Sequence, residues 1–351
     1  MNGFLNIHKP AGLTSHDVVA KVRRLLGVQR VGHTGTLDPA ATGVLPICIG
    51  KATKVAQFFL ETDKEYRVVM RLGEATDTED ATGKVLSRRP IASLTHEKIQ
   101  KTVEGFQGLQ SQIAPMYSAV KVGGEPLYKA ARQGRQVERP SRRVIIHRIN
   151  VLGIEHPDSA APHGPPDISE DQALPVRARG VGASEDITLP HPHGPPHIID
   201  VTFDVTCSKG TYVRTLCADI GEKLGVGGHL LRLERRRSGP FHIDKAIHLS
   251  EVQQRTAEGS IGEKLIPMEE VLSSYPSLRV TPEAERFVLH GAPIGAREIT
   301  YFPMEFKTGK AVLVYNAAGE LVALASALID RDQMAGVGRA APVFKINKVL
   351  V

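Results

Sequence analysis

The sequence predicts a mixed α and β protein, because two kinds of hydrophobic spacing occur within one chain. Between residues 16 and 26 apolar side chains recur at helical intervals, with Ser15 and Gly27 at the expected cap positions. Residues 199–206 alternate instead between apolar and polar, which is typical of a strand with one buried face. A chain of 351 residues is also long enough for two domains.

The first part of the chain is predicted to contain short strands interspersed with helices. We expect strands at 4–7, 44–49 and 66–72, and helices at 16–26, 53–60 and 95–106. Thr95 would cap the last of these helices. After the strand at 199–206, a further helix is expected over 211–224.

A second, smaller domain is expected from about residue 275. A short helix at 282–290 precedes two strands, 311–315 and 321–325, which are joined by a hairpin-like turn at 316–319. Residues 342–351 would form a closing strand. The sequence therefore predicts one domain at 1–274 and a β-rich domain at 275–351.

Residues 156–197 differ in composition from the rest of the chain. They are rich in Pro, Gly, His and acidic residues, and the sequence of 162–166 recurs at 192–196. Such a segment buries too little apolar surface to offset its ordering entropy, so we expect a mobile insertion between two core strands. Its histidines lack recognisable metal-ligand spacing, which favours a solvated loop over a metal site.

Composition and charge narrow the classes of function. The net charge of +6 indicates a modest attraction to polyanions. Its arginines gather in two runs, each of which alone would indicate a solvated face: Arg132, Arg135, Arg139, Arg142 and Arg143, and then Arg232, Arg235, Arg236 and Arg237. Because aromatic residues are 5% and Trp is absent, phosphate and shape contacts are favoured over a broad base-stacking surface.

The expected location of the protein is the cytoplasm. Three cysteines without a C-x-x-C pair favour buried packing in a reducing compartment over a disulfide framework. No stretch approaches the ~20 apolar residues of a membrane span, and the N-terminus lacks a signal-peptide pattern.

The segment 32–46 contains the main candidate for chemistry. Asp38 is its one acid, set among glycines and prolines that oppose a helix and allow a ligand to approach the backbone. An Asp before Pro also commonly opens a turn. Asp38 is therefore a candidate nucleophile or general base, with a turn residue as the alternative.

This segment closely resembles the catalytic motif of the TruB family of tRNA pseudouridine synthases. Other segments resemble further motifs of that family in the same order, at 6–15, 64–68, 72–80, 116–121, 130–134 and 207–215. The resemblance covers most of residues 2–155 and 198–248. It implies a pseudouridine synthase fold with a central, mainly antiparallel sheet flanked by helices and loops, followed by a small PUA-like RNA-binding domain.

The resemblance also implies a reaction. The family isomerises uridine 55 to pseudouridine in the T-loop of tRNA, after the base has been flipped out. No atom is oxidised and no group leaves the RNA, so no metal and no other cofactor is expected. By resemblance, Asp38 is the nucleophile, Arg214 pairs with it, and Tyr66 stacks on the uracil. The atom that Asp38 attacks, and whether Tyr66 also removes the C5 proton, are open alternatives.

Five further residues are assigned to substrate binding or to its surroundings by the same resemblance. His33 would fill the gap left by the extruded base, while Tyr212 and Leu233 would line the uracil pocket. Lys9 and Pro10 belong to the N-terminal motif and are expected at the site.

Residues 112–143 resemble the family's thumb, a segment that closes on the RNA arm, and its arginines would contact phosphates. Two positions depart from the family pattern: Glu234 stands where a second arginine is usual, and Ala114 stands where a second proline is frequent. We expect Glu234 to weaken one RNA contact without abolishing the chemistry. The expected partner is the T-arm of tRNA, bound by a monomer without a protein partner or guide RNA.

Three other functions compete with this interpretation. The main alternative is a non-catalytic tRNA-binding or folding factor on the same scaffold, but the presence of Asp38, Tyr66 and Arg214 together favours an enzyme. A guide-dependent synthase is disfavoured by the bacterial type of thumb motif. A nucleoside hydrolase would need a water-activating acid or metal, for which the sequence shows no motif.

Overall fold

The computed structural model describes residues 1–118, 120–135, 137–157, 198–302, 305–336, 338 and 341–350. The chain divides into two compact units: unit 1 is Met1–Arg67, Thr206–Gly210 and Leu233–Val351, and unit 2 is Val68–Val205 and Thr211–Arg232. Three strands contribute residues to both units, namely β4 (Lys64–Leu72), β11 (Ile199–Cys207) and β12 (Gly228–Ser238). The expected insertion at 156–197 lies, from residue 158 onward, outside the described residues.

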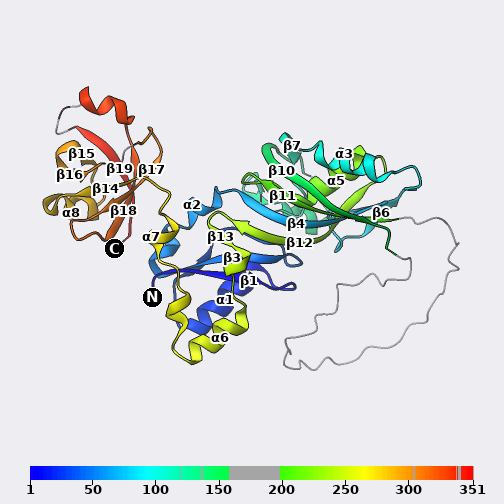
Figure 1. Ribbon diagram of the computed structural model, residues 1–351, viewed down its shortest axis with the longest axis horizontal. Coiled ribbons are helices and arrows are strands. Elements are labelled where there is room, and N and C mark those ends of the chain that lie inside the picture. Colours follow the sequence, from blue (N-terminus) through cyan, green and yellow to red (C-terminus); the bar gives the residue numbers. More distant parts are fainter. Residues whose placement is uncertain are drawn as a thin grey trace. The chain divides into compact units, whose positions relative to one another are not determined.

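Unit 1 begins with a sheet that is mainly antiparallel (Figure 1). Strand β3 (Thr42–Ile49) pairs antiparallel with β1 (Gly3–Lys9) and with β2 (Val31–His33). Strand β12 pairs parallel with β3 at Thr42 and Gly43, and antiparallel with β13 (Phe241–His242).

Two hydrophobic cores lie against this sheet because successive side chains of a strand point to opposite faces. Helices α1 (Ser15–Leu26) and α6 (Leu249–Ala257) cover one face, where Val18, Val22 and Val252 pack with Leu5, Ile7, Leu45 and Ile47. Phe4 and Val44 point into the second core, together with Phe59 and Phe241. The shorter helices of this part are η1 (Gly50–Lys54), α2 (Ala56–Leu60), η2 (Ile243–Lys245), η3 (Ile261–Lys264) and α7 (Met268–Val271).

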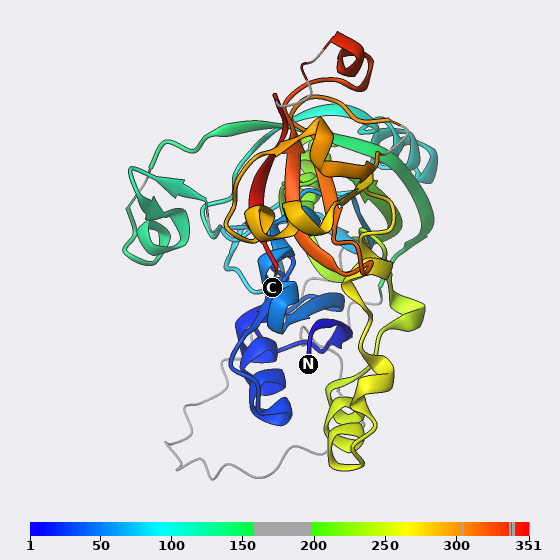
Figure 2. The ribbon, with the colours of Figure 1, turned by 90° about the vertical axis from the view of Figure 1, so that its left-hand side faces the viewer.

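The C-terminal part of unit 1 contains a six-stranded sheet, which faces the viewer in Figure 2. Its order is β15 (Ile294–Gly295), β19 (Pro342–Val349), β18 (Leu321–Ala327), β17 (Ala311–Tyr315), β14 (Ser277–Val280) and β16 (Ile299–Tyr301). Helix α8 (Pro282–Leu289) buries Ala284 and Val288 in the same core as these strands. Two short turns, η4 (Ala296–Glu298) and η5 (Arg331–Gly336), complete it. The expected hairpin and closing strand are thus confirmed.

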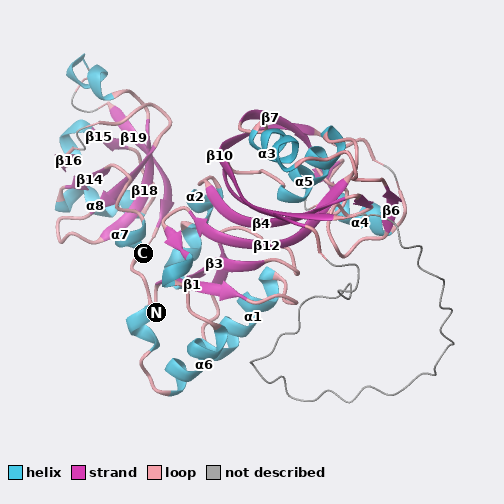
Figure 3. Cartoon of the chain, turned by 45° about the vertical axis from the view of Figure 1, so that its right-hand side comes forward, coloured by secondary structure: helices cyan, strands magenta, loops and turns pink. Residues whose placement is uncertain are grey.

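Unit 2 contains strands in the order β4, β11, β10 (Ser141–Glu155) and β7 (Gly108–Ile113). Helices α3 (His96–Glu104) and α5 (Val213–Lys223) lie beside β10 and β7 (Figure 3). Two hairpins and a helix complete this unit: β5 (Glu74–Thr76) with β6 (Val85–Arg88), β8 (Lys121–Val122) with β9 (Glu125–Pro126), and α4 (Leu127–Arg132). The predicted mixed α and β class with a mainly antiparallel sheet is confirmed.

Several expected helices have different boundaries or a different cap residue in the structure. The helix expected at 53–60 is a 3-10 turn, η1, followed by α2, and the helix expected at 211–224 is α5, which is shorter at both ends. Ser15 is not the cap of α1, because Thr14 takes that position and accepts a hydrogen bond from Asp17 N, while the Asp17 carboxylate accepts one from Thr14 N. This reciprocal capping box leaves the Ser15 hydroxyl available for another contact.

None of the helices among the described residues is both long enough and apolar enough to cross a membrane.

We predict that Thr14→Ala lowers the free energy of unfolding by about 1 kcal/mol, because the first turn of α1 loses its cap. Urea denaturation followed by circular dichroism measures this change. Thr14→Ser keeps the hydroxyl acceptor and should remain close to the wild type. An equal loss in both variants would contradict the role of the cap.

Candidate active site

Asp38 lies on the loop between β2 and β3, where its side chain is half-buried. The loop is closed by Ala41 N, which donates to Asp38 O at 3.1 Å, and by Gly12 N, which donates to Pro39 O at 2.9 Å. Its neighbours Leu37 and Ala41 are buried in the core of unit 1. The carboxylate therefore stands on an anchored loop, as the composition of the segment predicts.

Ser15 is one of the anchors of this loop. Its buried hydroxyl accepts a hydrogen bond from Leu37 N at 2.8 Å and donates to Leu37 O at 3.1 Å. Both main-chain groups of the residue before Asp38 are thus satisfied by one side chain. This role of Ser15 is not evident from the sequence, because Ser before a helical pattern is also the usual sign of an N-cap.

Lys9 is a second anchor, and its side chain is fully buried. Its ammonium donates to three main-chain carbonyls, those of Pro10 at 2.9 Å, Leu13 at 2.7 Å and Pro39 at 3.0 Å. Burial lowers the pKa of Lys9 to about 8, although the negative charge of Asp38 acts in the opposite direction. Three N–H donors match three carbonyls, so Lys9 ties the end of β1 to the residue after Asp38. Direct binding of substrate by Lys9 or Pro10 stays a prediction.

Arg235 is the third anchor, and only 1% of it is exposed. It donates to Val44 O from Nε at 2.7 Å, to Thr36 O at 3.3 Å and to Gly35 O at 3.1 Å. Strand β12 can approach this closely because Gly43 has no side chain: a Cβ there would lie 2.3 Å from the carbonyl oxygen of Arg235. The run of arginines at 232–237 alone would indicate a solvated face, and this interpretation is wrong for Arg235.

Tyr66 and Leu233 pack partly buried against the same core as Leu37. Burial raises the pKa of Tyr66 to about 12, while the nearby Arg235 guanidinium and its hydrogen bond to the phenol act in the opposite direction. A phenol with this pKa stays protonated near neutral pH. Whether Tyr66 stacks on the uracil, removes the C5 proton or does both stays a prediction.

His33 ends β2, five residues before Asp38 in the sequence. Its Nδ1 accepts a hydrogen bond from Gly35 N at 3.2 Å, and its ring centroid lies 5.5 Å from that of His16. Burial is the main reason why the pKa of His33 is lowered to about 4, and the neighbouring charges of His16 and Arg235 act in the same direction. The ring is therefore neutral near pH 7, and its place in the gap left by a flipped base stays a prediction.

Arg214 belongs to unit 2, where it lies in the first turn of α5 with 5% exposure. Its guanidinium donates to Thr78 O at 3.2 Å and to Tyr117 O at 2.9 Å, and lies 3.7 Å from Asp80 Oδ2. These acceptors offset the unfavourable position of a cation near a helix N-terminus. Arg214 is therefore buried and held by acceptors rather than exposed to solvent. The ion pair between Arg214 and Asp38 stays a prediction.

Tyr212 precedes α5 and is held by Gln112, the residue at which the expected thumb begins. Tyr212 N donates to Gln112 Oε1 at 3.0 Å, and Gln112 Nε2 donates to Tyr212 O at 3.1 Å. The Arg142 guanidinium lies over the Tyr212 ring at 5.2 Å. Residues of the expected thumb therefore position Tyr212 from two sides.

The expected thumb, residues 112–143, contains the β8–β9 hairpin and α4. Leu127 N donates to Val120 O at 2.8 Å and Tyr128 N donates to Ser118 O at 3.0 Å, which closes the hairpin onto the helix. Arg135 pairs with Glu125 at 2.6 Å on the exposed surface. Exposed pairs of this kind contribute little to stability, so Arg135 can exchange Glu125 for a phosphate at small cost.

Glu234 lies on the face of β12 opposite to Leu233 and Arg235, because side chains alternate along a strand. It pairs with Arg236 at 3.0 Å and with His8 at 3.7 Å. The departure from the family pattern at Glu234 is thus directed away from the Asp38 loop.

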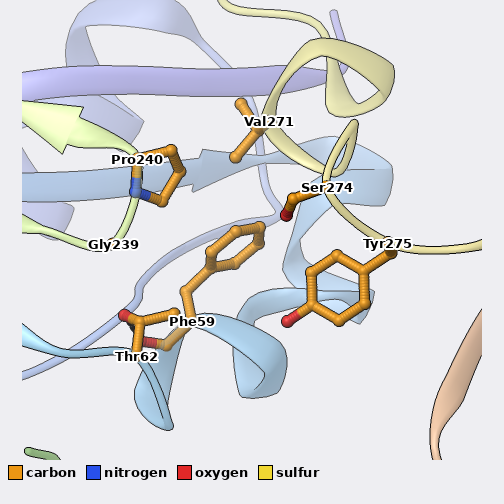
Figure 4. A pocket seen from close by; sticks show the side chains of 7 residues that line it. All are labelled: Phe59, Thr62, Gly239, Pro240, Val271, Ser274 and Tyr275. Atoms are coloured by element: carbon orange, nitrogen blue, oxygen red, sulfur yellow. Dashed lines mark hydrogen bonds between the residues drawn. The ribbon is translucent and has the colours of Figure 1, made fainter.

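A pocket of about 350 Å³ lies elsewhere in unit 1 (Figure 4). The rings of Phe59 and Tyr275 border it, together with Thr62, Gly239, Pro240, Val271 and Ser274. None of these lining residues is charged and none is a predicted site residue. The pocket is therefore distinct from the residues assembled near Asp38.

Comparison with known proteins identifies relatives along nearly the whole chain. The family model described as TruB family pseudouridylate synthase, N-terminal domain, matches residues 23–162, and that of the tRNA pseudouridylate synthase B C-terminal domain matches residues 214–273. The tRNA pseudouridine synthase B of Bacillus licheniformis is 41% identical over 293 residues, which are 83% of this chain and 82% of the relative. The protein of the same name from Clostridium tetani is 35% identical and matches 100% of both chains.

Among solved structures, a chain of the crystal structure of a Cbf5-Nop10-Gar1 complex superposes with a TM-score of 0.69 at 28% identity. The match covers 99% of this chain and 85% of that chain.

We predict that Arg235→Lys lowers the free energy of unfolding by about 2–3 kcal/mol, because one ammonium cannot satisfy the same main-chain carbonyls and Tyr66. Urea denaturation measures the change. Arg236→Lys is the matched control, since Arg236 is half-exposed on the same strand, and should change stability by less than about 0.5 kcal/mol. Equal effects would contradict the anchoring role of Arg235.

We predict that the wild type loses stability relative to Tyr66→Phe as the pH rises from 8 to 10.5. The unfolded chain releases the phenol proton near its ordinary pKa of ~10, whereas the folded protein retains it, so rising pH favours unfolding. Urea denaturation at the two pH values measures the difference. A Tyr66→Phe variant that loses as much stability as the wild type over the same pH range would contradict this prediction.

Proposed function

The chain belongs to the TruB family of pseudouridylate synthases and is a tRNA pseudouridine synthase, an isomerase; we propose that it acts on uridine 55 of the T-loop. The observation that carries the finer proposal is the anchored loop of Asp38. Ser15, Lys9 and Arg235 hold the main chain on both sides of this carboxylate. A group fixed before the substrate arrives reacts without further ordering, which favours covalent catalysis.

We propose Asp38 as the nucleophile of the reaction. The bond between uracil N1 and ribose C1′ breaks, and a bond between C5 and C1′ forms. C5 loses one proton and N1 gains one, so atoms and electrons balance without an oxidant. Carboxylates act at anomeric carbons in retaining glycosidases, where water is the final acceptor. Here the detached uracil itself is the acceptor, which is consistent with a single acid.

The surroundings of Asp38 suit a flipped pyrimidine. Tyr66 would stack on the uracil as a neutral phenol, and Leu233 would supply an apolar wall beside it. His33 is neutral and would occupy the space that the base leaves. Arg214 would pair with Asp38, and Tyr212 would complete the pocket.

We propose that residues 1–274 form the catalytic domain and that residues 275–351 form an RNA-binding domain of the PUA type. One core of the C-terminal sheet, built from Val312, Val322, Val343 and their neighbours, belongs to this part alone and supports the division. Leu313, Leu321 and Leu324 of the same sheet pack instead into the core that contains Phe4 and Phe59. The domain type itself rests on the resemblance.

We propose that the T-arm of tRNA is bound by a monomer in the cytoplasm, without a protein partner or a guide RNA. The Clostridium tetani relative matches this chain from end to end at 35% identity, while the chain of the Cbf5-Nop10-Gar1 complex is 28% identical. The greater similarity to the bacterial enzymes supports activity without a protein partner or a guide RNA. Mapping pseudouridine in tRNA incubated with this protein alone tests the site and the independence together.

We predict that Asp38→Asn binds a T-arm RNA within about threefold of the wild-type Kd and slows turnover by at least about 10⁴-fold, because the amide lacks the nucleophilic charge. Release of tritium from C5-labelled uridine measures turnover, and filter binding measures Kd. Asp63→Asn, at an exposed acid in the same unit, is the matched control and should turn over normally. Release at the wild-type rate from Asp38→Asn would contradict the assignment.

A further inference from the structure

The turn between β5 and β6 contains a strained residue that the proposed chemistry does not use. Among the described residues, Glu79 is the one non-glycine with a positive φ, at 63°. Side chains disfavour this conformation because Cβ approaches a carbonyl oxygen. A glutamate that adopts it must be held there by its surroundings.

The main chain of Glu79 is fixed on both sides. Glu79 N donates to Thr76 O at 3.3 Å, and Leu230 N donates to Glu79 O at 3.0 Å. Ala81 N donates in turn to Leu230 O at 2.9 Å. The turn is thereby attached to β12, and the direction of the Glu79 side chain is set.

The Glu79 carboxylate joins two elements that are distant in sequence. Oε2 accepts a hydrogen bond from the buried Thr215 Oγ1 at 2.7 Å, and Oε1 lies 3.8 Å from an Arg139 nitrogen. Thr215 directly follows Arg214 on α5. Arg139 also donates to Ala114 O at 3.4 Å.

Ala114 and Arg139 mark the base of the thumb. Ile113 and Ser141 are paired across β7 and β10, and Ala114 N donates to Pro140 O at 3.2 Å, so the chain enters and leaves the thumb there. Arg214 itself donates to Thr78 O, next to Glu79, and to Tyr117 O within the thumb. Arg214, the turn and the thumb therefore form one connected network.

We infer that Glu79 is a positioning residue, which holds Arg214 and the base of the thumb in a single arrangement. Its hydrogen bond to Thr215 sets the first turn of α5, and its ion pair with Arg139 sets the thumb. The orientation of Arg214 thus depends on the same carboxylate that orders the RNA-contacting segment. The inference rests on the proposed function, because it places Arg214 at the reaction site.

Four variants separate the two contacts of Glu79. Thr215→Val removes only the hydrogen bond, and Glu79→Gln keeps an oxygen acceptor for Thr215 but removes the charge beside Arg139. Glu79→Ala removes both contacts, and the double variant Glu79→Ala/Thr215→Val tests whether they act together. Glu97→Gln is the control, since Glu97 is an exposed acid of the same unit outside the thumb, and it should keep the wild-type rate and Kd.

The measurements are the single-turnover rate at saturating T-arm RNA, the Kd for the same RNA, and the folded fraction by circular dichroism. We expect Thr215→Val to slow the single turnover by about 10-fold with Kd changed by less than about twofold, because one buried hydrogen bond is lost. Glu79→Gln should stay within about threefold of the wild-type rate. Glu79→Ala should be at least as slow as Thr215→Val, and the double variant should be no slower than Glu79→Ala.

Two results would overturn the inference. One is a folded Glu79→Ala that turns over at the wild-type rate, and the other is a double variant in which the two effects multiply. A wild type that makes no pseudouridine would instead contradict the proposed function. An active wild type with an equally active Glu79→Ala would contradict only the role of Glu79.

Discussion

The loop that carries Asp38 depends on two buried cations, Lys9 and Arg235, whose N–H groups bind main-chain carbonyls. A buried charge is expensive unless hydrogen bonds replace its hydration, and here three carbonyls surround each cation. The acceptors that fix the loop in these hydrogen bonds are main-chain carbonyls rather than carboxylates. The lowered pKa of Lys9 shows that desolvation outweighs the favourable effect of Asp38.

In unit 2, main-chain carbonyls also bind a buried cation, Arg214. Main-chain carbonyls of Thr78 and Tyr117 hold its guanidinium, and Asp80 lies slightly beyond hydrogen-bond distance. A planar guanidinium bound to fixed acceptors has few alternative positions. The strained Glu79 contacts Thr215, next to Arg214, and Arg139 in the proposed thumb, so these residues belong to one network of contacts.

Local patterns predicted most elements, because hydrophobic period and turn residues depend only on near neighbours. The strands at 44–49 and 199–206, the C-terminal hairpin and the helix capped by Thr95 all form as expected. Errors occurred where one signal had two meanings. Ser15 resembled a helix cap but anchors Leu37, and Arg235 belonged to a run that looks solvated. The alternation of Leu233 and Arg235 on β12 was the signal that could have identified the buried arginine.

The sequence by itself determined the candidate catalytic residues and the family, because motifs are recognised from residue types and their spacing along the chain. Asp38, Tyr66 and Arg214 were all identified from such motifs. Only the tertiary structure decided which side chains hold the Asp38 loop, since Lys9, Ser15 and Arg235 reach it from β1, α1 and β12. It also decided the protonation of Tyr66 and His33, because desolvation depends on burial by residues that are distant in sequence.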